Sequence, residues 1–160
     1  MKRTTREWVR RAEGDWKDAQ ILAKGNSKSH DGVCFHCQQL VEKYLKAILV
    51  ENSVNFPKSH DLDRLLLLVL PIHPSLRSFR RGMLYLSEFA VEVRYPEYNA
   101  SKRQALAAIR WMEQIREECR TLLGIKPPLA TQEGFLIKSS VAGSAHPRRF
   151  GPSTILRTCS

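Results

Sequence analysis

The sequence predicts an all-α fold, an up-and-down bundle of four to five helices followed by an irregular C-terminal tail. Apolar residues recur at steps of three and four through several segments before residue 127, which is the spacing of one face of an α-helix. The loops between these segments are short, and none of the segments combines strand alternation with hairpin residues. From Pro127 onward the helical spacing ends and Gly, Ser, Thr and Pro accumulate. We therefore expect a helical bundle over residues 1–126 and a poorly packed or disordered tail over residues 127–160.

The first two predicted helices are long. The first begins near residue 5, because Thr4-x-x-Glu7 has the form of a capping box, and it ends at Gly25. The second runs from about Gly32 to Glu51. One face of this second helix carries the candidate core residues Cys34, Cys37, Val41, Tyr44, Leu45 and Ile48.

The third predicted helix is short and rich in leucine. Ser59 is its expected N-cap, and Pro71 ends it. Because leucine fills nearly every position from 65 to 70, we expect the rest of the fold to cover this helix on most sides.

The last two predicted helices have clear ends. The fourth opens at Pro74 and closes at Arg94-Tyr95-Pro96, and the fifth begins at the capping box Ser101-x-x-Gln104 and stops at Gly124. Their apolar steps predict core faces made of Leu76, Phe79, Met83, Leu86, Ala90 and Val93 in the fourth helix and of Ala105, Ala108, Met112, Ile115, Cys119 and Leu122 in the fifth.

The charge balance narrows the range of functions. Lys and Arg number 26 against 16 Asp and Glu, which gives a net charge of +10 and a pI of about 9.8. This surplus excludes an acidic disordered-tail protein and makes a phosphate-bearing partner plausible. The sequence contains no glycine-rich phosphate loop, so nothing in it indicates a P-loop or Rossmann nucleotide site.

Three features favour a cytoplasmic protein without membrane contact. The longest apolar run, Leu65–Leu70, is too short to cross a bilayer. The N-terminal residues lack the apolar segment of a secretory signal. The four cysteines form no dense framework of the kind that small secreted scaffolds need, so we expect reduced thiols.

The segment Cys34-Phe-His-Cys37 admits two interpretations. Together with His30, its spacings of four and three could place three metal ligands on one helical face. However, no second ligand pair is evident, and no strand precedes the motif as one does in redox sites. We favour small thiols in the core, and we expect neither a metal nor another cofactor.

The polar residues of the second helix are also ambiguous. They could form a functional polar face or a solvated one, and spacing alone favours a solvated face on which Glu42 and Lys46 form an i,i+4 pair. The residues concerned are Gln38, Gln39, Glu42, Lys43 and Lys46.

Two further residues each admit more than one functional or structural role. His60 stands beside Asp61 at a helix start, where it could bind an anion, act in acid/base chemistry or belong to the helix cap. Arg94 ends the fourth helix, where it could bind phosphate through its planar fork or form an ion pair with Glu88 or Glu92.

Four sequence blocks, taken together, resemble those of the HEPN family. They occur in order, cover residues 5–123, and leave the tail without a match. The blocks are Trp8-x-x-x-Ala12-Glu13-x-Asp15-Trp16-x-x-Ala19, the run from Phe35 to Ala47, Ser59-His60-Asp61-Leu62, and Arg94-Tyr95-Pro96.

The resemblance implies a four- to five-helix bundle that often dimerises and works beside a small nucleotidyltransferase in pairs of the toxin–antitoxin kind. Many HEPN proteins are metal-independent ribonucleases whose motif is an Arg and a later His with four to six residues between them, and two copies of the motif form one cleft across the dimer. Other members bind nucleotides without cleavage. In this chain no His follows Arg94 within that window, and Asn99 occupies the first candidate position. An Asn side chain cannot accept a proton as a general base near neutral pH.

We therefore expect a HEPN-type module that binds a nucleotide or RNA phosphate through Arg94, Lys43 and His60. We expect it to form a homodimer and to pair with a small nucleotidyltransferase in a toxin–antitoxin-like system. One alternative is a metal-independent ribonuclease toxin with a degenerate motif, in which Arg94 and Asn99 are the candidate catalytic residues. Another is a purely structural interaction bundle without a ligand.

Overall fold

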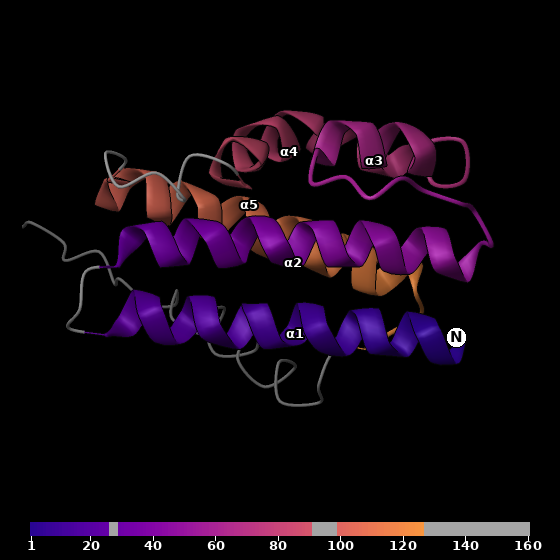
Figure 1. Ribbon diagram of the computed structural model, residues 1–160, viewed down its shortest axis with the longest axis horizontal. Helices are drawn as coiled ribbons and strands as arrows, with labels where there is room; N and C mark the ends of the chain where they lie inside the picture. Colours follow the sequence, from indigo (N-terminus) through magenta and orange to yellow (C-terminus); the bar gives the residue numbers. More distant parts are fainter. Residues whose placement is uncertain (26–28, 91–98, 127–160) are drawn as a thin grey trace, which may run out of the picture. The chain divides into compact units, whose positions relative to one another are not determined.

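The computed structural model describes residues 1–25, 29–90 and 99–126. These residues form helices and no strand, and they pack together as one unit. Figure 1 shows the arrangement. None of the described helices combines the length and the hydrophobicity that a membrane span requires. The elements are α1 (Arg3–Lys24), α2 (His30–Glu51), α3 (Leu62–Val69), the 3-10 helix η1 (Pro74–Phe79), α4 (Arg80–Ser87), the 3-10 helix η2 (Glu88–Ala90) and α5 (Lys102–Leu122).

Helix α2 is the centre of the bundle. It packs most extensively against α1, which runs antiparallel beside it, and it also contacts α3, α4 and α5 (Figure 1). The core face predicted for this helix is confirmed, because all six of its residues are fully buried. Burial on several sides explains why this helix, unlike α1, is apolar over much of its circumference.

The starts of the first two helices differ from the prediction. Helix α1 begins at Arg3, and no side chain caps it, so the Thr4 capping box is wrong. A distant carboxylate takes its place, since Glu51 accepts hydrogen bonds from the Lys2 N–H at 2.8 Å and the Thr5 hydroxyl at 2.6 Å. Helix α2 begins two residues earlier than predicted, at His30, with Ser29 as its N-cap.

Helix α3 has a different cap and a more exposed side than predicted. Its N-cap is Asp61 and not Ser59, and the Asp61 carboxylate accepts the backbone N–H groups of Asp63 and Arg64. Leu67 is 56% exposed, so the expectation that leucines would be covered on most sides is wrong there. The buried face of this helix consists of Leu62, Leu65, Leu66 and Val69.

The predicted fourth helix is divided into three parts. Pro74 opens η1 as a tight 3-10 helix, α4 follows from Arg80, and η2 ends at Ala90. Its predicted core residues Leu76, Met83 and Leu86 are fully buried. The predicted close at Arg94-Tyr95-Pro96 lies outside the described residues.

Helix α5 agrees closely with the prediction. Ser101 and Gln104 form the reciprocal capping box. Gly124 has a φ of +68°, the left-handed conformation that glycine adopts most easily after a helix. The predicted boundary after residue 126 adjoins the tail 127–160, which lies outside the described residues, so that boundary stays a prediction.

Candidate functional site

The residues predicted to bind phosphate do not gather in one place in the described part of the chain. Arg94 lies outside the described residues. Asn99 is exposed, two residues before the N-cap of α5. Lys43 and His60 each contact a carboxylate, but the two carboxylates belong to different residues.

His60 contacts a buried polar cluster on α2. Its Nδ1 lies 3.1 Å from Glu42, which also accepts hydrogen bonds from Lys46 at 2.7 Å and Gln38 at 3.0 Å. Burial raises the pKa of Glu42, but the hydrogen bonds from Lys46 and Gln38 outweigh it and leave the pKa below its usual value. Gln38, Glu42 and Lys46 are all at most 7% exposed, so the predicted solvated face is wrong here. The predicted i,i+4 ion pair between Glu42 and Lys46 is confirmed, although as a buried one.

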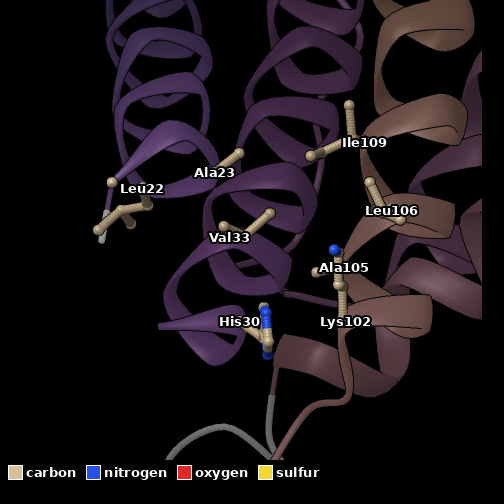
Figure 2. Close-up of a pocket in the computed structure, with 9 residues that line it drawn as sticks. Leu22, Ala23, His30, Val33, Lys102, Ala105, Leu106 and Ile109 are labelled. Atoms are coloured by element: carbon tan, nitrogen blue, oxygen red, sulfur yellow. The ribbon is translucent and has the colours of Figure 1, made fainter. Parts of the chain in front are cut away.

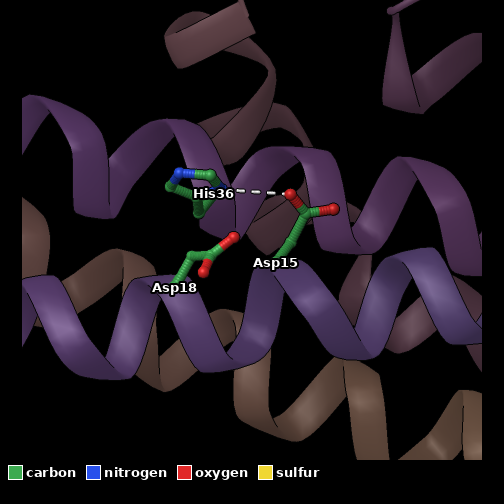
Figure 3. A group of neighbouring side chains, drawn as sticks. All are labelled: Asp15, Asp18 and His36. Carbon is green, nitrogen blue, oxygen red and sulfur yellow. Dashed lines mark hydrogen bonds and ion pairs between the residues drawn. The ribbon is translucent and has the colours of Figure 1, made fainter.

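Lys43 contacts a second cluster, between α1 and α2. Its ammonium group donates to Asp15, and the other oxygen of this carboxylate lies 3.0 Å from Nδ1 of His36 (Figure 3). Asp18 stands nearby, so Asp15, Asp18 and His36 form a group of described residues with the spacing of metal ligands. The Lys43 ammonium already supplies the positive charge that a metal ion would bring to Asp15.

The cysteines of the alternative metal set are core residues. Cys34 and Cys37 are fully buried and form no disulfide. Cys119 of α5 is also a fully buried free cysteine. Burial raises the pKa of Cys34 to about 12 and raises that of Cys37 as well. Metals bind the thiolate, so these two thiols are poor ligands in this environment.

A third polar cluster links three helices through Glu13 of α1. Its carboxylate accepts hydrogen bonds from Arg116 at 2.6 and 3.0 Å, from Arg120 at 3.1 Å and from the Tyr44 hydroxyl. Burial raises the pKa of Glu13, but the hydrogen bonds from Arg116 and Tyr44 outweigh it and leave the pKa below its usual value. The Arg116 guanidinium also lies 4.5 Å from the ring centroid of Trp16, a cation–π contact. The carboxylate, the two guanidinium groups and the Tyr44 hydroxyl all have partners, so we assign this Glu13 cluster to stability.

A pocket of a different character lies between α4 and α5. It has a volume of about 450 Å³, and Arg81, Arg103 and Arg110 contribute guanidinium groups to its lining. Within the described part of the chain, none of these three arginines has a hydrogen-bond or ion-pair partner for its side chain, and all three are exposed. Tyr85 and Trp111 supply aromatic rings to the same pocket. We call this site the α4–α5 pocket.

The walls of the α4–α5 pocket are held by close packing. A Cβ atom added to Gly82 would lie 2.4 Å from the Trp111 ring, so glycine at this position lets the indole rest against the backbone of α4. The Tyr85 hydroxyl donates a hydrogen bond to the Gln104 carbonyl of α5. A smaller hollow of about 250 Å³ adjoins the pocket, shares Ala107, Arg110 and Trp111 with it, and adds Gln114.

The prediction from sequence did not select these arginines. Arg103, Ala107 and Arg110 follow helical spacing, which would have placed them on one face of α5. Nothing in the sequence indicates that Arg81 of α4 joins them, because that depends on how the two helices pack. The resulting set of fixed aromatic rings and free guanidinium forks suits an anion that carries a planar group, as a nucleotide does.

Comparison with known proteins agrees with the fold. Residues 5–122 match the family described as the HEPN domain. A crystal structure of an archaeal HEPN homologue aligns with 79% of this chain and 100% of its own, with a TM-score of 0.59 and 23% sequence identity. At that identity the likeness concerns the fold alone. No curated protein matches the sequence.

Proposed function

The chain belongs to the HEPN domain family, and from this premise we propose that it is a module that binds nucleotide or RNA phosphate. We propose further that it acts as the partner of a small nucleotidyltransferase in a toxin–antitoxin-like pair, and that it is a homodimer. The observation that carries the binding function is the α4–α5 pocket, which is lined by two aromatic rings and by three arginines that have no acidic partner among the described residues.

The contrast with other arginines supports this function. Arg10, Arg80, Arg116 and Arg120 form ion pairs with glutamate or aspartate. An arginine that is already paired must give up a carboxylate before it binds a phosphate, whereas those of the α4–α5 pocket need give up only water.

The residues selected from the sequence differ in how well they fit phosphate binding. Arg94 lies between α4 and α5 in the sequence and is proposed as a further phosphate ligand. Lys43 and His60 are weaker candidates, since binding phosphate would draw Lys43 away from Asp15, and the Glu42 carboxylate beside His60 would repel a phosphate. Asn99 can offer an amide hydrogen bond but not proton transfer.

RNA cleavage without metal is a second candidate function, and one observation favours it. The His60 side chain is 59% exposed, while its Nδ1 faces the buried carboxylate of Glu42. A carboxylate on one ring nitrogen orients the imidazole and leaves Nε2 to accept a proton. In this second function, His60 would take the proton of a ribose 2′-hydroxyl as that oxygen attacks the adjacent phosphorus, and the 5′-oxygen would leave with a proton taken from water.

Titration of a short labelled RNA and of ATP tests the binding function. The double variant Arg103→Ala/Arg110→Ala should weaken binding at least about tenfold, because each charged hydrogen bond contributes about 1.5–3 kcal/mol. Arg94→Ala should also weaken it. The matched control is Arg11→Ala/Lys17→Ala, which removes two exposed cations from another long helix and should change affinity much less.

The outcomes separate the candidate functions. Equal losses in the pocket variant and its control would mean that affinity follows net charge and would refute a specific site. Cleavage of RNA by the pure protein in the presence of a chelator, lost in His60→Gln and Glu42→Gln, would favour the ribonuclease. Absence of any RNA or ATP binding would leave the structural bundle as the better interpretation. Light scattering that shows a monomer at micromolar concentration would contradict the homodimer.

A further inference from the structure

A second concave site lies on the other side of α5, between that helix, α1 and α2 (Figure 2). Its volume is about 410 Å³, which is within the range of small-molecule sites. The lining is mostly aliphatic, with side chains from all three helices. These apolar residues are Leu22, Ala23, Val33, Ala105, Leu106 and Ile109.

Two nitrogen-bearing side chains lie at one end of this α1–α2–α5 groove. Figure 2 shows His30 and Lys102 together below the aliphatic residues. In the described ranges, neither side chain has a hydrogen-bond or ion-pair partner. The nearby acid in sequence, Asp31, instead accepts the backbone N–H of Ala100. The groove therefore has an apolar body and a positively charged end for which the described residues supply no counter-ion.

The groove also leaves apolar surface in water. Leu106 is 50% exposed, although it belongs to the lining. Covering such surface is favourable by about 25 cal/mol per Å². A polar anion such as free phosphate would pair with Lys102 but leave the aliphatic wall uncovered, and a neutral hydrocarbon would leave the ammonium unpaired.

We infer that the α1–α2–α5 groove binds a small amphipathic anion, with a carboxylate at Lys102 and His30 and an aliphatic chain against the wall formed by Val33, Leu106 and Ile109. The Lys102 ammonium donates to the carboxylate as a charge-assisted hydrogen bond, and the His30 imidazole offers an N–H in either tautomer. This site uses none of the residues of the α4–α5 pocket, so the inference does not depend on the proposed RNA or nucleotide binding.

Calorimetric titration of the full chain with octanoate tests this inference, with chemical-shift mapping of backbone amides to locate the site. Octanoate should bind saturably and shift the amides of Ala23, Val33 and Ala105. 1-Octanol and octylamine, which share the chain but lack the negative charge, should bind at least about tenfold more weakly.

Four variants connect the binding to the named groups. Lys102→Gln should weaken octanoate binding about tenfold, and Leu106→Glu should abolish it by placing a carboxylate beside the ligand. The matched controls are Lys58→Gln, an exposed lysine elsewhere, and Leu84→Glu, a leucine that is 46% exposed on α4. Both controls should bind octanoate as wild type does.

Two results would overturn the inference. The first is absence of saturable octanoate binding, and the second is equal binding of octanoate, octanol and octylamine. If the first is accompanied by a change in the oligomeric state of Leu106→Glu by light scattering, the groove is instead an interface between protein chains. All the substituted side chains are exposed, so the melting curves of the variants should be close to that of wild type. The same curves will identify any variant that has failed to fold.

Discussion

Arginines near the two ends of α5 lie in opposite surroundings. Near its C-terminal end, Arg116 and Arg120 lie against Glu13 of α1 and are nearly buried. Nearer its start, Arg103 and Arg110 line a pocket against α4 and have no acidic partner in the described structure. The surroundings of an arginine, and not its presence, therefore separate a stabilising role from the binding role that we propose.

The physical reason is the balance between desolvation and pairing. A buried guanidinium loses its hydration and must be compensated by a carboxylate, as Glu13 compensates Arg116. An exposed guanidinium keeps its water and contributes little to folding, and it stays available to an anionic ligand.

Removing Glu13 should damage the paired end of α5 most. Glu13→Ala leaves Arg116 and Arg120 without their carboxylate, and breaking a buried pair on one side typically costs about 3–5 kcal/mol. Because these groups are not fully buried, we expect a loss of about 3 kcal/mol in the free energy of unfolding, measured by urea denaturation. The control Glu7→Ala breaks an exposed pair with Arg10 and should cost much less, because water screens exposed charges. Similar losses in the two variants would contradict the role of the Glu13 cluster.

Substituting Gly82 should disturb the wall of the α4–α5 pocket. The new Cβ of Gly82→Ala would clash with Trp111, so the two helices must separate, at a cost of about 1–3 kcal/mol. RNA binding should weaken as well, since the aromatic wall moves. Gly14→Ala is the matched control: nothing lies within 4 Å of a Cβ there, and alanine should stabilise α1 by about 0.5–1 kcal/mol. A stable Gly82→Ala protein with normal RNA affinity would show that this contact is unimportant.

Acid should weaken the paired clusters. Glu13 and Glu42 have pKa values below the usual 4.5 in the folded protein, so the unfolded chain binds more protons than the folded chain at low pH. The stability from these pairs is present above about pH 4.5 and is lost as the pH falls through the lowered values. Hydrogen bonds from Thr5 and the Lys2 N–H lower the pKa of Glu51 to about 2, so this loss should continue toward pH 2. Urea denaturation at a series of pH values measures the slope, which should be shallower in Glu42→Gln, and an unchanged slope would contradict the assignment.

The smallest effect on stability should come from the unpaired arginines. Arg103→Ala/Arg110→Ala removes no ion pair formed within the described ranges, so the free energy of unfolding should change by no more than about 0.5 kcal/mol per site. The same variant should reduce the dependence of RNA affinity on salt, because fewer phosphate contacts release fewer counterions. A large loss of stability with unchanged salt dependence would reverse the comparison and give these arginines a structural role.

Much of the fold follows from local patterns in the sequence. The core face of α2, the capping box at Ser101 and the stop at Gly124 were all predicted, because each depends on helical spacing or on residues within a few positions. Some errors were local, since Asp61 and not Ser59 caps α3, but others occurred where a distant residue replaced a local signal. Glu51 holds the start of α1 in place of Thr4, and the polar residues of α2 are buried because α1 and the His60 segment cover them.

The helical class, the central helix, the surplus of positive charge and the HEPN resemblance follow from the sequence alone. Each depends only on composition, on residue spacing or on short motifs, and these can be identified without knowing how the helices pack. The packing of the helices decides which charged side chains form ion pairs and which, within the described part of the chain, do not. Glu13 and Arg116 are 103 positions apart, and the α4–α5 pocket joins Arg81 to Arg103 across two helices. Such pairings depend on helix packing, which no local pattern specifies, and they separate the stabilising arginines of this protein from those available to bind phosphate.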